Sequence, residues 1–198
     1  MNRLQTYKAV LNDNEDGMFC ISLVQAPAVE CNFLAFSKNK TQLNFKIENE
    51  EERIITGVIM RTNYPIYREQ NGQAFYLIFE KDTIEKMVIK WLSEGNVNNL
   101  NGEHNTQNIL TGVMLREVFI KDSSKNINPI GFEDIEDGSL FATYKVLNDD
   151  VWQQIKDGTF KGFSLEGVFD IEISKSEEEK EWEEVLELLK KVINKEKK

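Results

Sequence analysis

Apolar and polar positions along most of the chain alternate in short runs, which is the pattern of β-strands rather than of long helices. Such runs are rich in Val, Ile, Phe, Tyr and Thr and are bounded by Gly, Asn, Asp or Pro. The runs that meet this description cover residues 18–25, 54–60, 74–79, 112–120, 140–146 and 162–173. The pattern therefore predicts a protein built mainly around strands.

Two short helices are expected between these strands. Asp82 is the predicted N-cap of the first helix, which ends before Gly95. Asn148 or Asp149 caps the second helix, which stops at Gly158. Because strands and helices do not alternate regularly, we expect an α+β fold whose mainly antiparallel or mixed sheet is folded or closed around one core.

The last segment, residues 175–198, has a different pattern. Ser176 and Glu179 have the spacing of a capping box, and acidic residues come before basic ones, an order that complements a helix dipole. Apolar residues follow at helical spacing: Trp182, Val185, Leu186, Leu189, Val192 and Ile193. We therefore expect a main domain over 1–174 and an amphipathic C-terminal helix over 175–198, which packs either on that domain or on a partner helix.

Composition narrows the classes of function. The chain has 198 residues, of which 40% are hydrophobic and 29% charged, so it can form a globular core. Its net charge is 24 − 34 = −10, which argues against a general binder of nucleic acid or of acidic membranes. No apolar run is long enough to cross a bilayer, and the first residues lack the apolar core of a signal peptide, so we expect a cytoplasmic protein.

Cys20 and Cys31 form neither a disulfide framework nor a CxxC metal motif.

The chain has a single histidine, His104, which excludes any mechanism that needs two imidazoles and any zinc site built from several histidines. His104 lies in the polar stretch 98–105, between a predicted helix and a predicted strand. Functional residues concentrate in such connections, and an imidazole can act as a general base near neutral pH. A surface or structural histidine is the alternative.

A histidine base needs a nucleophile, and Ser164 is the best candidate. It lies in the segment 161–167, where glycines on both sides permit close approach of the backbone. The spacing is not that of the Gly-x-Ser-x-Gly elbow, and a serine in a strand with a glycine bulge is the alternative. Cys20 and Cys31 are rival nucleophiles, although the apolar neighbours of Cys20 are more typical of a buried, inert thiol.

The group that orients the imidazole must be a carboxylate, an amide or water. Glu117 is a charged residue in an otherwise apolar, strand-like segment, and it would reach His104 if the two lie on neighbouring strands. Its alternative role is that of a solvated acid paired with Arg116 or a nearby lysine. The competing carboxylates are Asp122, Glu166 and Asp170.

Several segments, taken in order, are similar to those of a known family. They are Ile55-Thr56-Gly57-Val58-Ile59-Met60, Pro65-Ile66-Tyr67-Arg68, Phe75-Tyr76-Leu77-Ile78-Phe79, Glu103-His104-Asn105, Arg116-Glu117-Val118-Phe119-Ile120, Val151-Trp152-Gln153-Gln154-Ile155 and Gly162-Phe163-Ser164-Leu165-Glu166-Gly167. In their order and spacing, over residues 17–172, they resemble the prohead (capsid maturation) serine proteases of tailed phages, in the branch called putative phage serine proteases.

The resemblance implies a β-barrel with flanking helices like that of herpesvirus assemblin. It also implies an endopeptidase that cleaves scaffold, capsid-protein extensions and itself inside the immature capsid, in the host bacterial cytoplasm, without a metal or organic cofactor. By motif, Ser164 matches the family's nucleophile, His104 its histidine and Glu117 a recurrent acid. The assemblin combination of one serine with two histidines cannot hold here, because the second histidine is absent.

The segment 21–28 is similar to one that follows the nucleophile in many prohead proteases. Its position before Ser164 implies a circularly permuted chain, in which Cys20 or Ser22 lies near the site. Two other functions stay open: a catalytically inactive module associated with the scaffold, in which His104 and Ser164 lie far apart, and another serine hydrolase such as an esterase.

Overall fold

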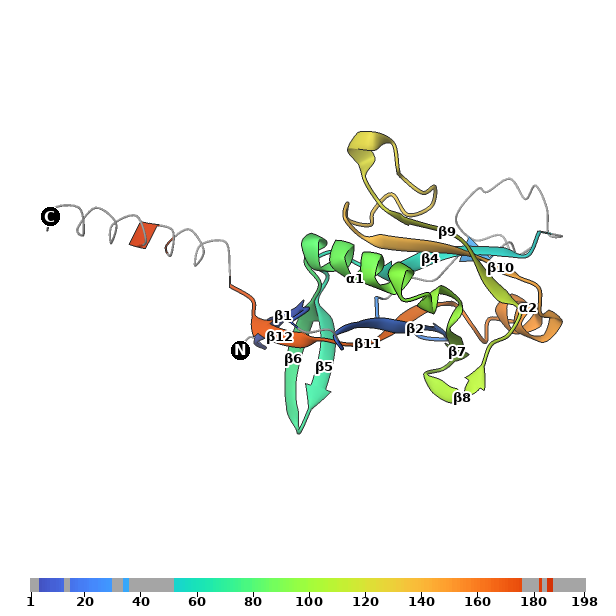
Figure 1. Ribbon diagram of the computed structural model, residues 1–198, viewed down its shortest axis with the longest axis horizontal. Helices are drawn as coiled ribbons and strands as arrows, with labels where there is room; N and C mark the ends of the chain where they lie inside the picture. The colour runs from blue at the N-terminus through green and yellow to red at the C-terminus, as the bar shows by residue number, and fades with distance from the viewer. Residues whose placement is uncertain are drawn as a thin grey trace, which may run out of the picture.

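The computed structural model describes residues 4–12, 15–29, 34–35, 52–175, 182 and 185–186, and the fold is that of these residues (Figure 1). Strands dominate it. The strands are β1 (Thr6–Val10), β2 (Gly17–Val24), β3 (Leu34–Ala35), β4 (Ile54–Met60), β5 (Ile66–Gln70), β6 (Gln73–Ile78), β7 (Leu100–Gly102), β8 (Asn105–Ile109), β9 (Val113–Ile120), β10 (Leu140–Val146), β11 (Gly162–Val168) and β12 (Asp170–Ile173). The helices are α1 (Lys81–Ser93) and α2 (Asp149–Lys156), with short 3₁₀ turns η1 (Asn96–Asn98) and η2 (Ser123–Lys125).

The strands form three four-stranded sheets, in the orders β12-β1-β6-β5, β3-β4-β10-β9 and β11-β2-β7-β8. Most neighbours are antiparallel, but β1 pairs with β6 and β2 pairs with β7 in parallel. The strand order of the third sheet unites distant parts of the sequence, because β2 near the N-terminus lies between β11 and β7. The N-terminal strand β2 thus pairs with β11, the strand that carries Ser164, as expected from the segment 21–28.

The expected fold class is wrong in two respects. The described residues are mostly β rather than α+β, and their three sheets are open, with no closed barrel. Closure needs the two outer strands of a sheet to pair with each other or with the next sheet, and hydrogen bonding ends here at β12, β5, β3, β9, β11 and β8. The expected helix over 175–198 falls mainly outside the described residues, and no C-terminal helix is among the elements above.

The two helices inside the domain are confirmed, with one change of cap. Asn148 caps α2, because its side-chain oxygen accepts hydrogen bonds from the amides of Asp150 and Val151. The N-cap of α1 is Glu80 rather than Asp82, and its side chain makes no capping hydrogen bond. The apolar side of α1 packs against β2 and buries Trp91 completely. The helix is held by this packing rather than by its cap.

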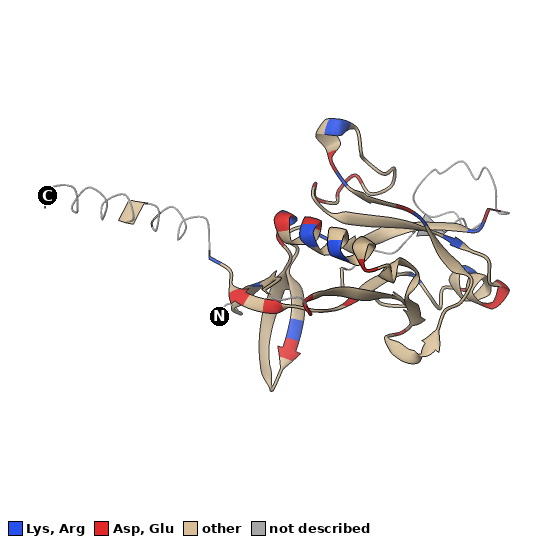
Figure 2. Ribbon diagram, in the orientation of Figure 1, with Lys and Arg blue, Asp and Glu red and all other residues tan. Residues whose placement is uncertain are grey.

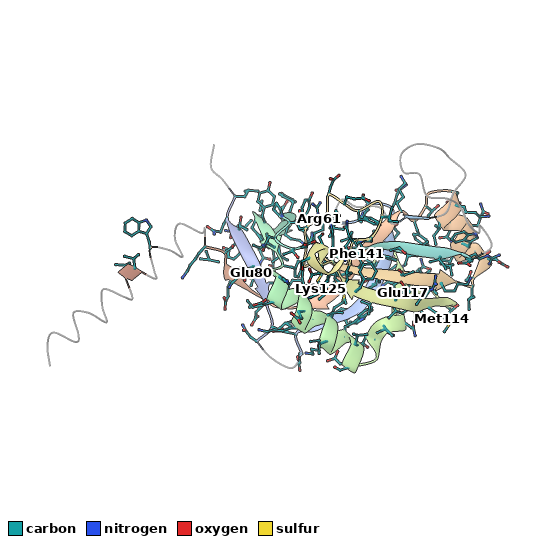
Figure 3. All side chains as sticks on the ribbon, turned by 90° about the horizontal axis from the view of Figure 1, so that it is seen from above. Arg61, Glu80, Met114, Glu117, Lys125 and Phe141 are labelled. Carbon is teal, nitrogen blue, oxygen red and sulfur yellow. The ribbon has the colours of Figure 1, made fainter. Side chains whose placement is uncertain are left out.

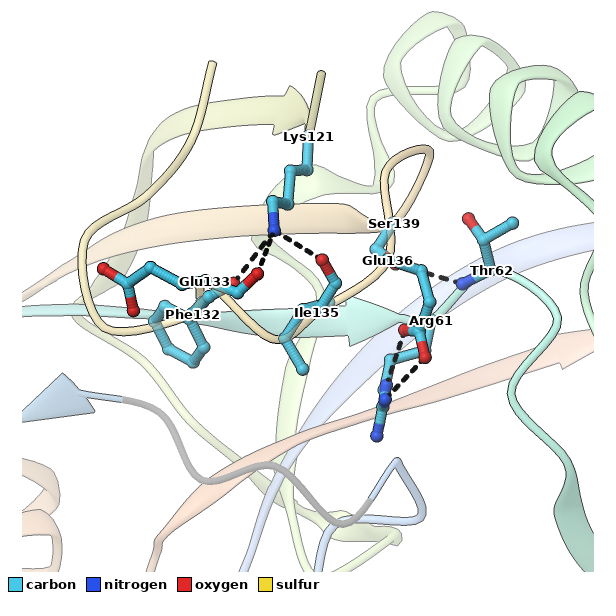
Figure 4. A network of polar contacts seen from close by, with 8 residues as sticks. All are labelled: Arg61, Thr62, Lys121, Phe132, Glu133, Ile135, Glu136 and Ser139. Atoms are coloured by element: carbon cyan, nitrogen blue, oxygen red, sulfur yellow. Dashed lines mark hydrogen bonds and ion pairs between the residues drawn. The ribbon is translucent and has the colours of Figure 1, made fainter. Parts of the chain in front are cut away.

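The long connection between β9 and β10 is tied down by a buried lysine (Figure 4). Lys121 is only 3% exposed, and its ammonium group donates to the carbonyl oxygens of Phe132 at 3.1 Å, Glu133 at 2.9 Å and Ile135. All three N–H donors of the ammonium are therefore used. Farther along the connection, Glu136 forms a bidentate ion pair with Arg61, the residue that follows β4, with N···O distances of 2.9 and 2.7 Å.

Charged side chains of both signs are interspersed on the surface. Figure 2 shows Lys and Arg next to Asp and Glu on α1 and on the β5–β6 hairpin. On α1, Lys90 lies 3.7 Å from Glu94, one turn further along. No helix among the described residues is long and apolar enough to span a membrane.

Candidate functional site

The alternation of side chains along β2 and β11 creates the candidate site. Ile21 and Leu23 of β2 and Phe163 of β11 are completely buried in the core. Successive residues of a strand face opposite sides, so the polar side chains between these apolar ones share the other face of the sheet. That face carries Cys20, Ser22, Ser164 and Glu166.

The register of the sheet brings these residues together. Ser22 lies directly opposite Ser164, and Cys20 lies opposite Glu166. On the other side of β2, Asn101 of β7 is the partner of Ser22. Side chains of directly opposite residues in antiparallel strands have Cβ atoms roughly 4.5–5.5 Å apart. Three strands thus contribute one compact polar cluster.

His104 reaches this cluster from the tight turn between β7 and β8. Glu103 and His104 form the turn, and both have φ = 55°, a left-handed conformation that favours the twist of a short hairpin. A Cβ on the preceding Gly102 would lie 2.3 Å from Nδ2 of Asn108, so a larger residue there would require the Asn108 side chain to move. The carboxylate of Glu103 accepts a hydrogen bond of 2.6 Å from the amide of Gln25, which anchors the turn to the end of β2.

The contacts of Ser22 lie at the centre of the cluster. Its Oγ lies 3.0 Å from Nδ1 of His104 and 2.7 Å from Oδ1 of Asn101, and it also makes a short hydrogen bond to Oε1 of Glu166. The same Oε1 atom lies 3.3 Å from Nδ1 of His104 and accepts a hydrogen bond of 2.6 Å from Nδ2 of Asn101. Ser22 and Asn101 are buried, whereas the side chain of His104 is 47% exposed. The imidazole therefore has one side in the cluster and another side open to solvent.

Glu166 is held in its ionised form. Partial burial raises the pKa of its carboxyl, but hydrogen bonds from Ser22 and Asn101 and the neighbouring His104 outweigh burial and lower the pKa below 4.5. Cys20 behaves in the opposite way, because burial and the charge of Glu166 raise the pKa of its thiol from 9.0 to about 11. A protonated thiol is a poor nucleophile, which weakens the case for Cys20 as the attacking group.

The lowered pKa of Glu166 predicts a loss of stability in acid. A carboxylate with a lowered folded-state pKa stabilises the fold above its unfolded pKa, here 4.5, and that contribution disappears as the pH falls through the folded value. We expect the melting temperature of wild type to fall more steeply below pH 4.5 than that of Glu166→Gln. Thermal unfolding between pH 2 and 7 measures this difference, and Glu117→Gln is the control. Parallel curves for wild type and Glu166→Gln would contradict the prediction.

Among the predicted site residues, His104 and Ser164 lie at this cluster and Glu117 lies elsewhere. Ser164 is buried on β11, and the register places it next to Ser22. Glu117 belongs to β9 of another sheet (Figure 3); its side chain is 55% exposed and lies 3.4 Å from Nε of Arg116. The carboxylate in contact with His104 is that of Glu166.

The remaining candidates take other places. Asp122 caps η2 and lies 2.7 Å from Nζ of Lys125, while Asp170 on β12 accepts a hydrogen bond from Asn12. Cys31 lies outside the described residues. Asn101 received no role from the sequence, because an asparagine within a polar stretch shows no distinct pattern. In the part of the chain that the structure covers, no group of three or more His, Cys, Asp or Glu could hold a metal ion.

Comparison with known proteins identifies the family of the chain. Neither a curated protein nor a solved structure matches the chain. A family model described as "Putative phage serine protease XkdF" matches residues 41–172, which is more than half of the sequence and includes His104, Ser164 and Glu166. The chain therefore belongs to the family of the phage serine protease XkdF.

Proposed function

We propose that this protein is the endopeptidase of phage capsid maturation, which cleaves scaffold protein, extensions of the capsid protein and itself inside the prohead. The observation that carries the proposal is the contact of His104 with both Glu166 and Ser22 on the face of the sheet that also bears Ser164. A base, a carboxylate and hydroxyl groups in mutual reach are the requirements of acyl transfer by a serine. Membership in a phage serine protease family supports the same reaction.

In this reaction Ser164 is the nucleophile. Its Oγ attacks the carbonyl carbon of the peptide while the imidazole of His104 takes the hydroxyl proton. The imidazolium then gives this proton to the leaving amine, and a water molecule, activated by the same imidazole, hydrolyses the acyl-enzyme. Glu166 is proposed as the carboxylate that orients His104 and stabilises the imidazolium, the role that the sequence suggested for Glu117. No metal or organic cofactor takes part in these steps.

The proposed partners are the phage scaffold and the major capsid protein. The segment 175–198 is proposed to contact scaffold helices or a second copy of the chain through its apolar residues, since its sequence has the spacing of an amphipathic helix. The competing function is that of an inactive, scaffold-associated module. In that case the cluster around His104 would be purely structural, and no covalent chemistry would occur at Ser164.

Covalent labelling tests the proposal without knowledge of the cleavage site. A fluorophosphonate probe should add once to wild type, and peptide mapping should locate the adduct on Ser164. Ser164→Ala should remain unlabelled, whereas Ser123→Ala, a change in the exposed η2 turn, should be labelled like wild type. Absence of any adduct on folded wild type, together with intact scaffold and capsid protein after co-expression, would favour the inactive module.

A further inference from the structure

We infer that Ser22 is a positioning residue which, with Glu166, keeps the proton of the neutral His104 ring on Nδ1 and leaves Nε2 as the basic atom. The catalytic meaning of this inference rests on the proposed function. The position of the proton itself follows from the hydrogen-bond donors and acceptors of the cluster.

The amide of Asn101 has only one favourable orientation. Its Nδ2 donates to Oε1 of Glu166 at 2.6 Å and lies 3.4 Å from Sγ of Cys20. Exchanging the oxygen and nitrogen of the amide would press Oδ1 against an ionised carboxylate oxygen, which is repulsive. Oδ1 of Asn101 therefore faces Oγ of Ser22, 2.7 Å away, as a hydrogen-bond acceptor.

The hydroxyl of Ser22 has one proton and already has two oxygen acceptors within reach, on Asn101 and Glu166. If Nδ1 of His104 were unprotonated, it would be a third acceptor, 3.0 Å from Oγ of Ser22 and 3.3 Å from the carboxylate. A buried cluster with more acceptors than protons is costly, because each unpaired lone pair loses its hydration without compensation. A proton on Nδ1 resolves the conflict, since it can be shared between Ser22 and Glu166.

This protonation separates the roles of the two serines. A neutral imidazole has one N–H, so a proton on Nδ1 leaves the lone pair on Nε2. Ser22 contacts the nitrogen that is not basic and therefore does not give its proton to His104 as the nucleophile would. Ser164 lies directly opposite Ser22 on the same face and is the serine proposed to act with Nε2. Of the other titratable groups nearby, Glu103 is held by the amide of Gln25 and Cys20 remains a protonated thiol.

A single histidine makes the proton position directly measurable. In protein labelled with ¹⁵N-histidine, long-range ¹H–¹⁵N spectra distinguish the two neutral tautomers. At a pH where the ring is neutral, wild type should have its proton on Nδ1, and Ser22→Ala should show a smaller excess of this tautomer. A wild-type ring with its proton on Nε2 overturns the inference. The measurement needs no substrate, so it gives its answer even if the protein proves to have no peptidase activity.

Kinetics then test the positioning role. Ser22→Ala should lower kcat by about a hundredfold with little change in KM, because a misplaced base acts mainly on the chemical step. Ser22→Thr keeps a hydroxyl and should recover part of the loss, and both variants should still accept the fluorophosphonate on Ser164. Two results would overturn the role: labelling of Ser22 in place of Ser164, or a Ser22→Ala enzyme with unchanged kcat and unchanged tautomer.

Discussion

Replacing His104 by asparagine is expected to lower kcat/KM for peptide cleavage by about a thousandfold or more, while the protein stays folded. General-base catalysis alone contributes roughly 10²–10⁴-fold, and histidine in a serine protease also protonates the leaving amine. Asparagine is the preferred replacement because residue 104 has φ = 55°, a conformation that asparagine adopts more readily than alanine. The rate can be measured on the phage's own scaffold protein, with the products identified by mass spectrometry.

Two carboxylate variants complete this experiment. Glu166→Gln should also reduce the rate strongly, because the amide would no longer stabilise the imidazolium, whereas Glu117→Gln should leave it nearly unchanged. The pair therefore also tests the role that the sequence suggested for Glu117. A large loss of activity in Glu117→Gln with an active Glu166→Gln would reverse the proposed assignment. Full activity of His104→Asn would reject a serine mechanism based on this histidine.

The sequence predicted individual strands better than their assembly. The strands Ile54–Met60 and Leu140–Val146 have the predicted bounds, because each is a mostly apolar, β-branched and aromatic run that pairs on both sides inside a sheet. The predicted strand over 162–173 is instead divided into β11 and β12, and a register shift falls between Glu166 and Gly167. There a Cβ on Gly167 would lie 2.5 Å from the carbonyl oxygen of Gly17, so the close approach of two backbones needs glycine. Such an approach depends on a partner 150 residues away, which no local pattern indicates.

The same limit applies to the candidate site. His104 could be found from the sequence because it is the single imidazole and lies in a polar turn. Glu166 follows Ser164 by two positions, so a strand places both on one face, and this spacing could have ranked it above Glu117. The resemblance of segment 21–28 placed Ser22 near the site, but the contacts of Ser22, and the presence of Asn101 beside it, depend on the register of three strands. Register follows from the packing of whole strands and is not visible in any short segment.

The largest expected loss of stability comes from Lys121→Met, a change of nearly equal length that removes the buried ammonium group. Three carbonyl oxygens, of Phe132, Glu133 and Ile135, would lose their donor, and the contacts to Phe132 and Ile135 are buried (Figure 4). Unpaired buried acceptors cost roughly 1–3 kcal/mol each, partly offset by the transfer of an apolar side chain, so we expect a net loss of about 3 kcal/mol. For a domain of this size that corresponds to a melting temperature lower by about 6–12 °C.

Lys125→Met is the matched control for this prediction, since Lys125 belongs to the same connection and has a side chain that is 72% exposed. Its ion pair with Asp122 lies at the surface, where water and salt screen the attraction, so its loss should change stability little. Differential scanning calorimetry of the two variants beside wild type should therefore show a large shift for Lys121→Met and almost none for Lys125→Met. Equal shifts would mean that the connection between β9 and β10 is not held by the buried lysine. Ser164 and the turn that carries His104 belong to the β11-β2-β7-β8 sheet, whereas Lys121 connects two strands of the β3-β4-β10-β9 sheet. Fluorophosphonate labelling of Lys121→Met below its melting temperature should therefore match wild type. Such a result would separate the stability of the fold from the chemistry of the site.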